Sequence, residues 1–377
     1  MRSQQSAVSN PSLQQVQKDW QTLDGNDFIV SPSIRVVTNI SDLANDEIKA
    51  ERVQPNWFVR LFSKRSFLRY FYHLFYAMQI VYTTTKNSVA VIDGSGIAWL
   101  FAGYINRFLV RRRRVMILSD CFLEYHLGTE HRLRFFPFVT FKTKWKIALA
   151  RGALLGYDTA LLWSRKQIAP HAKMFNLPEE RFCFIPFKSN HSKRASYHLP
   201  MGGFVFSGGN GKRDYPCLIE AVQDTEIPVI ISATDSRARK DLKSLPNVIV
   251  LGAPEPAYAQ LTAASQFAVV PMIYSGVKGG AEAFFCDSMW YSKAVIACCS
   301  IAAEDYIIDG ETGYVLPSGD VEGLRQRILE LWNDPAKCEE MGRKGREHCE
   351  KHFTHEHYIR RCLRLALVVF AEYGDFN

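Results

Sequence analysis

The sequence lacks the features that mark several large protein classes. No run of roughly 18 or more uncharged apolar residues occurs, so a membrane-spanning helix is not expected. Hydrophobic residues make up 47% of the chain and charged residues 22%, values that exclude a disordered or fibrous chain. The stretch Met1-Arg2-Ser3-Gln4-Gln5 is too polar for a secretion signal. We expect a cytoplasmic globular protein that is either free or held peripherally at a membrane surface.

Paired cysteine motifs and paired acidic motifs are also missing. The nine cysteines are odd in number and scattered, and no Cys-x-x-Cys pair occurs. This excludes a disulfide framework or a zinc site and predicts buried free thiols in a reducing compartment. No Asp-x-Asp pair occurs either, and Asp309-Gly310-Glu311 is typical of a turn. We therefore predict no metal site.

What the sequence does contain is a regular alternation of strand-length and helix-length segments. The 377 residues are enough for about two domains. In the second half the predicted strands are continuous apolar runs without in–out alternation, which predicts a parallel sheet with helices on both faces. These strands are 203–207, 228–232, 247–251, 267–271, 294–298 and 313–316, with helices predicted over 214–222, 255–264 and 282–291.

The first half shows the same alternation less regularly. Its predicted strands are 88–92, 115–118, 159–163 and 182–185, with helices at 67–81 and 97–109. A polar segment, 188–198, is interpreted as a linker. We therefore predict an α/β protein of two doubly wound Rossmann-like domains facing across a cleft. The domains are 1–195 and 196–354, and a C-terminal helix within 355–377 packs back on the first domain because its apolar residues would otherwise be exposed.

Two glycine-rich loops follow predicted strands of the second half. In the first loop, Gly208, Gly209, Asn210, Lys212 and Arg213 precede a helix that Asp214 is expected to cap. The P-loop spacing fails, since position 206 is Phe and Arg213 follows the lysine. Glycine amides at a helix N-terminus can still bind an anion. The alternative, a plain tight turn with exposed basic residues, stays open on these residues alone.

The second loop, 274–282, contains Lys278, Gly279 and Gly280. Like the first, it precedes a predicted helix, so its backbone amides could bind an anion. Both loops should lie at one edge of the sheet, where they can hold a diphosphate between them. Asp287 follows within the next helix and can bind ribose hydroxyls, although a solvated helix face is the simpler interpretation of that residue.

The second half resembles a known family. From Gly203 to Phe353 it is similar to the nucleotide-sugar-binding half of GT-B glycosyltransferases, specifically glycosyltransferase family 4. The resemblance is weak in the first half, where it rests on 157–164 and 176–186. In the second half the matching stretches are 213–221, 287–296 and 305–320, the last being the most specific.

The resemblance implies roles for particular residues, and the sequence departs from the family at some of them. The family carries two glutamates eight positions apart, which match Gly279 and Asp287 here. The first carboxylate is thus absent, and Glu282 is the candidate to replace it. The family's acceptor-side histidine matches Ser119, which is followed by Asp120. We take Asp120 and Glu282 as candidate catalytic residues and the two glycine loops with Asp287 as donor-binding.

The implied function is transfer of a sugar from a nucleotide sugar, with a UDP-sugar favoured, to a hydroxyl acceptor. The resemblance implies retention of configuration, with the departing phosphate oxygen taking the acceptor's proton. No cofactor is expected beyond the nucleotide-sugar co-substrate, and basic side chains with loop amides would meet the diphosphate's charge. The acceptor is a small molecule, a glycan or a lipid-linked molecule. The alternative is a catalytically degraded homologue that binds a sugar nucleotide or a partner protein.

Basic residues of the first half allow two interpretations. Arg111 to Arg114 precede a predicted strand, and the basic residues of 60–69 lie among aromatic ones. A charged surface over an aromatic core is the favoured interpretation. If 60–69 forms a helix, its basic side chains point in most directions around the helix axis and do not form the single basic face of a membrane-binding helix. Contact with an anionic membrane surface is the other interpretation. We expect no nucleic-acid partner, since no segment resembles a recognition module.

Overall fold

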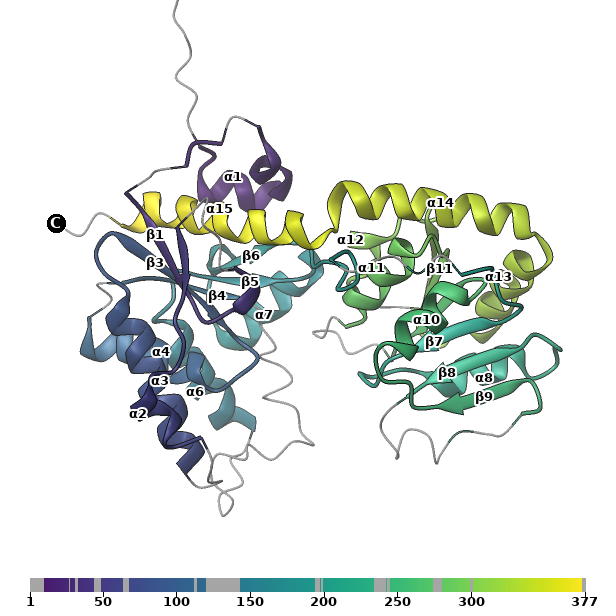
Figure 1. Cartoon of the computed structure of the whole chain (residues 1–377), viewed down its shortest axis with the longest axis horizontal. Helices are drawn as coiled ribbons and strands as arrows, with labels where there is room; N and C mark the ends of the chain where they lie inside the picture. The colour runs from purple at the N-terminus through teal and green to yellow at the C-terminus, as the bar shows by residue number, and fades with distance from the viewer. Residues whose placement is uncertain are drawn as a thin grey trace, which may run out of the picture. The chain divides into compact units, whose positions relative to one another are not determined.

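The chain forms two compact units, drawn in Figure 1. The computed structural model describes residues 10–26, 28–30, 33–43, 49–63, 68–111, 114–119, 143–193, 197, 199–233, 242, 245–273, 280–298 and 301–374. The first unit comprises Met1–Ile185 with Ile359–Asn377, and the second comprises Pro186–Tyr358. The division follows Ile185, whereas the sequence analysis set it after residue 195.

The first unit is built on a six-stranded parallel sheet of order β2-β1-β3-β4-β5-β6. Its strands are β1 (Arg35–Thr38), β2 (Ala50–Arg52), β3 (Ser88–Asp93), β4 (Val115–Ser119), β5 (Thr159–Leu162) and β6 (Phe182–Phe184). The last four match the predicted strands. The first two were missed because they contain few apolar residues: β1 has only Val36 and Val37, and β2 exposes two of its three residues.

Helices cover both faces of this sheet (Figure 1). They are α1 (Leu13–Lys18), α2 (Trp57–Arg60), α3 (Arg69–Thr83), α4 (Ala98–Tyr104), α6 (Thr143–Leu154), α7 (Ile168–Phe175) and α15 (His355–Tyr373), with the π-helical turn η4 (Ile105–Leu109) and the short 3-10 helices η1 (Trp20–Asp24), η2 (Ser41–Leu43), η5 (Arg165–Gln167) and η6 (Glu179–Arg181). From Ile359 on, α15 belongs to this unit and buries its apolar residues.

The second unit holds another six-stranded parallel sheet, of order β12-β11-β10-β7-β8-β9. Its strands are β7 (Val205–Gly208), β8 (Val229–Ser232), β9 (Val248–Leu251), β10 (Ala268–Pro271), β11 (Val295–Cys298) and β12 (Gly313–Leu316). All six lie where the sequence predicted strands. The expectation that each is buried on both faces is wrong for β9, which lies at the edge of the sheet and leaves Ile249 57% exposed.

Two cores lie on opposite faces of this second sheet, which makes the unit doubly wound. One core packs Val205 against Leu218 and Leu324, and the other packs the adjacent Phe206 with Phe285 and Tyr306. The helices are α8 (Tyr215–Val222), α10 (Ala257–Ala264), α11 (Glu282–Trp290), α12 (Ala303–Tyr306), α13 (Val321–Asn333) and α14 (Pro335–His352). Two parallel α/β sheets are thus confirmed.

The cysteines within the described residues behave as the sequence predicts. Seven of them are free and buried. Burial raises the pKa of the Cys183 thiol to about 12 and that of Cys217 to about 11, so both thiols stay protonated and unreactive near neutral pH. No helix of the described chain is long and apolar enough to cross a bilayer.

Candidate functional site

The candidate site lies at the edge of the second sheet where the strands end. Because the strands are parallel, the loops that follow β7, β9 and β10 leave the sheet at this edge and lead into α8, α10 and α11. Strands β7 and β10 are direct neighbours. The two glycine-rich loops therefore start from adjacent strands, as the sequence analysis assumed.

Backbone geometry explains the glycines of the first loop. At Gly208, the end of β7, a Cβ atom would lie 2.3 Å from the Tyr258 hydroxyl, so only glycine lets the α10 side chain approach. Gly209 has φ +113°, a conformation that side chains disfavour. Its N–H donates to the Ser232 carbonyl (3.0 Å) and its carbonyl accepts from the Tyr215 hydroxyl (2.5 Å). The Gly209 N–H is thus already hydrogen-bonded within the protein.

Arg213 closes the same loop. Its Nε donates to the Gly208 carbonyl and its Nη1 to the Gly211 carbonyl, both at 3.0 Å. Nη2 lies 2.6 Å from where a Cβ on Gly209 would stand, and it makes no hydrogen bond among the described residues. The guanidinium is therefore oriented by two carbonyls of its own loop, and its role in binding an anion stays a prediction.

The neighbouring residues complete the turn into α8. Asp214 caps the helix as predicted, its side chain accepting from the Cys217 amide at 3.3 Å. Lys212 is exposed and adopts φ 48°, and its carbonyl accepts from the Ile273 amide at 3.0 Å. Asn210 is also exposed. The loop is thus tied to the segment that follows β10.

The second loop is described only from Gly280 onward, so the predictions for Lys278 and Gly279 lie outside the described residues, as does that for Asp120. Gly280 has φ +142°. Its N–H donates to the Glu282 carboxylate at 2.7 Å, and Glu282, the first residue of α11, is buried. This contact gives Glu282 a structural role in the loop. Its catalytic role stays a prediction.

Asp287 lies in the middle of α11 and is 4% exposed, so it is not on a solvated helix face. Its Oδ1 accepts three hydrogen bonds from one segment. The Ser189 hydroxyl donates at 2.7 Å, the Asn190 amide at 2.8 Å and the His191 amide at 3.3 Å. Residues 189–191, which the sequence analysis interpreted as linker, are therefore anchored within the second unit.

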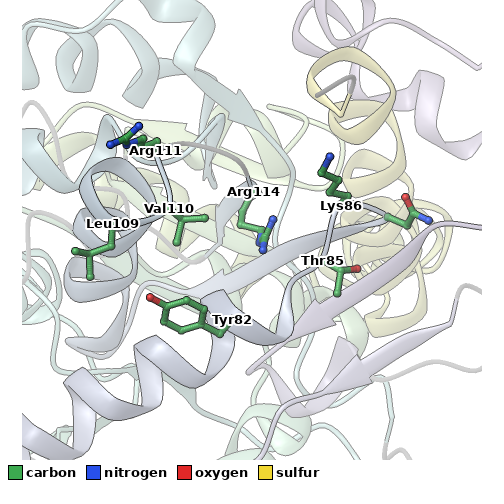
Figure 2. Close-up of a pocket in the computed structure, with 8 residues that line it drawn as sticks. Tyr82, Thr85, Lys86, Leu109, Val110, Arg111 and Arg114 are labelled. Carbon is green, nitrogen blue, oxygen red and sulfur yellow. The ribbon is translucent and has the colours of Figure 1, made fainter. Parts of the chain in front are cut away.

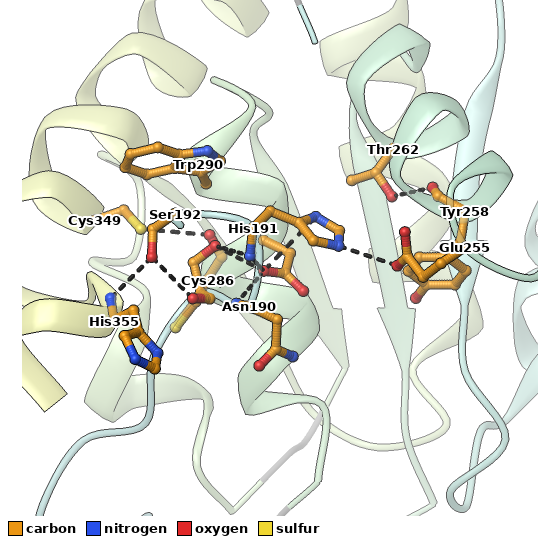
Figure 3. A network of polar contacts seen from close by, with 12 residues as sticks. Asn190, His191, Ser192, Glu255, Tyr258, Thr262, Cys286, Trp290, Cys349 and His355 are labelled. Atoms are coloured by element: carbon orange, nitrogen blue, oxygen red, sulfur yellow. Dashed lines mark hydrogen bonds and ion pairs between the residues drawn. The ribbon is translucent and has the colours of Figure 1, made fainter. Parts of the chain in front are cut away.

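The network continues outward through the His191 side chain, as Figure 3 shows. Its Nε2 lies 3.0 Å from Glu255 Oε1, while its Nδ1 lies 3.9 Å from Asp287 Oδ1. The ring is almost fully buried and packs near Tyr291, with 5.3 Å between ring centroids. Glu255, in the loop between β9 and α10, is 44% exposed and forms the outer end of the network.

Burial raises the pKa of the Asp287 carboxyl above its usual range, although His191 and the three donated hydrogen bonds oppose the shift. Burial thus disfavours the charged carboxylate, and the three donated hydrogen bonds offset part of that cost. The carboxylate is buried under a protein segment, and its role as a ribose ligand stays a prediction.

Sequence reasoning missed Ser189, His191, Glu255 and Tyr258. The first two lie in a polar segment whose composition is typical of a linker, and burial of such a segment leaves no local signal. Tyr258 packs edge-on against Phe206 and Phe284 beneath the glycine turn, with ring centroids 5.4 and 5.8 Å apart. Its contact with Gly208 joins residues fifty positions apart in the sequence, so no local sequence motif could have predicted it.

Chemically, this edge offers an oriented guanidinium, an exposed lysine and the N-terminal ends of two helices, all of which suit an anionic group. Among the described residues no group of three His, Cys, Asp or Glu side chains is placed to hold a metal ion.

Comparison with a family model matches residues 215–334 to Glycosyl transferases group 1. This segment contains α8, α10, α11 and the strands between them, and it begins directly after the Gly208–Asp214 loop. No curated protein matches the chain.

Solved structures share the fold at low sequence identity. TarM from S. aureus is 15% identical, with a TM-score of 0.56 over 81% of this chain, which spans only 58% of TarM. HepE from Anabaena, solved with UDP, is 14% identical, with a TM-score of 0.58 over 89% of this chain and 99% of HepE. Starch synthase IV from Arabidopsis thaliana, bound to ADP and acarbose, is 12% identical, with a TM-score of 0.58 over 83% of this chain and 78% of the other. The chain has the GT-B glycosyltransferase fold, and its residues 215–334 match the group 1 glycosyl transferase family.

Proposed function

We propose that the protein transfers a sugar from a nucleotide-sugar donor to a hydroxyl acceptor. The observation that carries this proposal is the Gly208–Asp214 loop, in which Arg213 is held by two loop carbonyls beside the N-terminus of α8. The segment matched by the glycosyl transferase model begins at Tyr215, directly after this loop. A diphosphate needs such an arrangement of fixed positive charge.

The donor is proposed to be a UDP-sugar, and the transferred group a hexosyl unit. HepE, which shares the fold, is solved with UDP and supports this choice, whereas starch synthase IV is solved with ADP. Gly208, Gly209, Asn210, Lys212 and Arg213 would bind the diphosphate together with Lys278, Gly279 and Gly280. Asp287 would act on the ribose side.

The proposed reaction retains the anomeric configuration and uses neither metal nor cofactor. The bond from the anomeric carbon to the phosphate oxygen breaks, and a bond to the acceptor oxygen forms on the same face. The acceptor's proton passes to the departing phosphate oxygen, so no side-chain base is required. Arg213 and Lys212 then stabilise the charge on the leaving diphosphate.

The first unit is proposed to bind the acceptor, with Asp120 on the acceptor side and Glu282 on the donor side. The acceptor would be a small molecule, a glycan or a lipid-linked molecule. We also propose that this unit contacts a membrane surface, because aromatic side chains on α2 and α3 are exposed, Trp57 by 76% and Phe71 by 48%.

One observation favours a second candidate function. The sequence has Gly279 where the resemblance places a catalytic glutamate, and the carboxylate of Glu282 is engaged with the Gly280 amide. A homologue that binds a sugar nucleotide without turning it over would have these features.

Both candidates are tested by incubating the protein with UDP-, GDP- and ADP-sugars and measuring release of the nucleoside diphosphate. We expect release from one donor class, and Arg213→Ala should remove most of it while the protein stays folded. Arg343→Ala, at an exposed position on α14, is the matched control and should keep full activity. Binding of a nucleotide sugar without any release, with acceptors of each class present, would favour the second candidate.

A further inference from the structure

A basic cavity lies in the first unit, at the edge of its sheet where strands β3 and β4 begin (Figure 2). Its volume is about 900 Å³. It is lined by the end of α3 with the turn into β3, and by the end of η4 with the turn into β4. The lining residues are Tyr82, Thr85, Lys86, Asn87, Leu109, Val110, Arg111 and Arg114.

The described lining of this cavity is basic. Its described lining contains three cationic side chains, Lys86, Arg111 and Arg114, and no carboxylate. Lys86 and Arg111 are exposed and make no ion pair among the described residues. An anion bound between Lys86 and Arg111 would relieve the repulsion between these two like charges.

The fold fixes the backbone at Arg114 and just before Arg111. The buried Asn106 donates through its side-chain amide to the carbonyls of Arg114 (2.9 Å) and Gly156 (2.8 Å). The Val110 amide donates to the Ile105 carbonyl at 3.0 Å, closing the π-helical turn, and Arg111 adopts φ 54°. A strained residue beside a π-helical turn is often found at a functional site.

Exposed apolar side chains adjoin the cavity and continue along α3. Tyr82 is 56% exposed, Leu109 65% and the adjacent Phe108 59%. Phe71 and Tyr82 are eleven positions apart, about three helical turns, so they lie on one stripe of α3. Phe75 and Met78 lie between them on that stripe and are half-buried.

The apolar stripe extends beyond α3 at its far end. Phe58 of α2 lies 5.2 Å from Phe75 between ring centroids, and beside it Trp57 and Leu61 are 76% and 61% exposed. The exposed Arg60 flanks them. A surface of this kind, apolar along its length and basic at its ends, matches the interface of an anionic bilayer better than solvent.

We propose that this cavity binds the phosphate headgroup of an anionic membrane lipid while the α3 stripe lies in the bilayer interface. Guanidinium groups pair with phosphate through two parallel hydrogen bonds, and the exposed Tyr82 and Leu109 would contact the acyl region. The proposal rests on the membrane contact proposed above for the first unit, and it is independent of sugar transfer.

Vesicle co-sedimentation of the full chain tests it, with phosphatidylglycerol vesicles against pure phosphatidylcholine at physiological ionic strength. The wild-type protein should bind the anionic vesicles only. Lys86→Glu/Arg111→Glu should weaken that binding by roughly tenfold or more, since each basic residue near the surface contributes about 1 kcal/mol. Lys18→Glu/Lys173→Glu makes the same charge change at exposed positions of the same unit and should weaken binding far less.

Two results would overturn the proposal. One is that the wild-type protein does not bind anionic vesicles. The other is that both double variants lose vesicle binding equally, which would mean that binding depends only on the net charge of the chain. Inorganic phosphate at millimolar concentration is the second probe. If it stabilises the wild type but not Lys86→Glu/Arg111→Glu while vesicles do not bind, the cavity takes a soluble phosphate and the lipid assignment is wrong. Nucleotide-induced stabilisation of the Lys86→Glu/Arg111→Glu variant, measured in parallel, reports on the donor site separately.

Discussion

At the residue scale, Asp287 allows a structural role to be separated from a functional one. Asp287→Ala removes the acceptor of three hydrogen bonds and leaves buried donors at residues 189–191 unpaired, so we expect a loss of about 1–3 kcal/mol of unfolding free energy. Asp287→Asn keeps an oxygen at Oδ1 to accept these hydrogen bonds and removes a charge that burial disfavours. It should therefore stay near wild-type stability while losing nucleotide affinity.

Urea unfolding and nucleotide titration of both variants make the comparison. Ser189→Ala, which removes one of the three donors, is the intermediate case. If Asp287→Asn binds nucleotide as tightly as the wild type, Asp287 serves only to anchor residues 189–191, and its assignment to the ribose is wrong.

Also at the residue scale, a buried ion pair ties the N-terminal segment to α15 within the first unit. Arg361 is fully buried, its Nε donates to Asp24 Oδ1 at 2.9 Å, and its guanidinium lies 4.1 Å from the Trp20 ring centroid. Asp24→Ala leaves that charge buried without its carboxylate and should cost roughly 3 kcal/mol.

The matched variant is Asp24→Leu/Arg361→Met, which removes both charges and should recover most of the stability lost in Asp24→Ala. Thermal unfolding of the three proteins provides the comparison. An Asp24→Ala protein as stable as the wild type would mean that Arg361 finds another partner or reaches water.

At the element scale, α14 carries a histidine that links stability to pH. Burial, with smaller contributions from the nearby His352 and Lys351, lowers the pKa of His348 to about 4. The folded chain thus binds this proton more weakly than the unfolded chain, whose pKa is about 6.5. His348 contributes stability that is present above about pH 6.5 and is lost as the pH falls toward 4.

His348→Gln should therefore flatten the fall in stability of the second unit between about pH 7 and pH 5, as measured by urea unfolding at each pH. The same slope in the variant and the wild type would mean that other groups control the acid sensitivity.

The sequence predicted the elements better than it predicted the site. Continuous apolar runs such as 267–271 and 294–298 revealed the buried strands, because a strand covered on both faces needs apolar residues at every position. Strands β1 and β2 were missed because they contain few apolar residues. The edge position of β9 was missed because its composition matches that of a central strand. The glycine loop was recognised from spacing, since its conformations require glycine. The anchoring of residues 189–191 to α11 depends on tertiary contacts and has no local signature.

At the scale of the whole molecule, two parallel sheets of six strands establish the GT-B fold, while the chemistry rests on one edge of the second unit. The family match covers residues 215–334, so the second unit has the stronger functional argument. The first unit contributes the basic cavity and the exposed aromatic stripe, which we propose contact a membrane surface.

The central claim, that the edge carrying Arg213 binds a nucleoside diphosphate, is tested most directly by thermal stability in the presence of UDP, GDP, ADP and CMP, with and without EDTA. A ligand at about 100 times its Kd adds roughly 2.7 kcal/mol, enough to raise Tm by a few degrees. We predict a rise with one diphosphate, UDP foremost, that is unchanged by EDTA and lost in Arg213→Ala. A Tm that no nucleotide moves, or a rise that Arg213→Ala retains in full, would contradict the account.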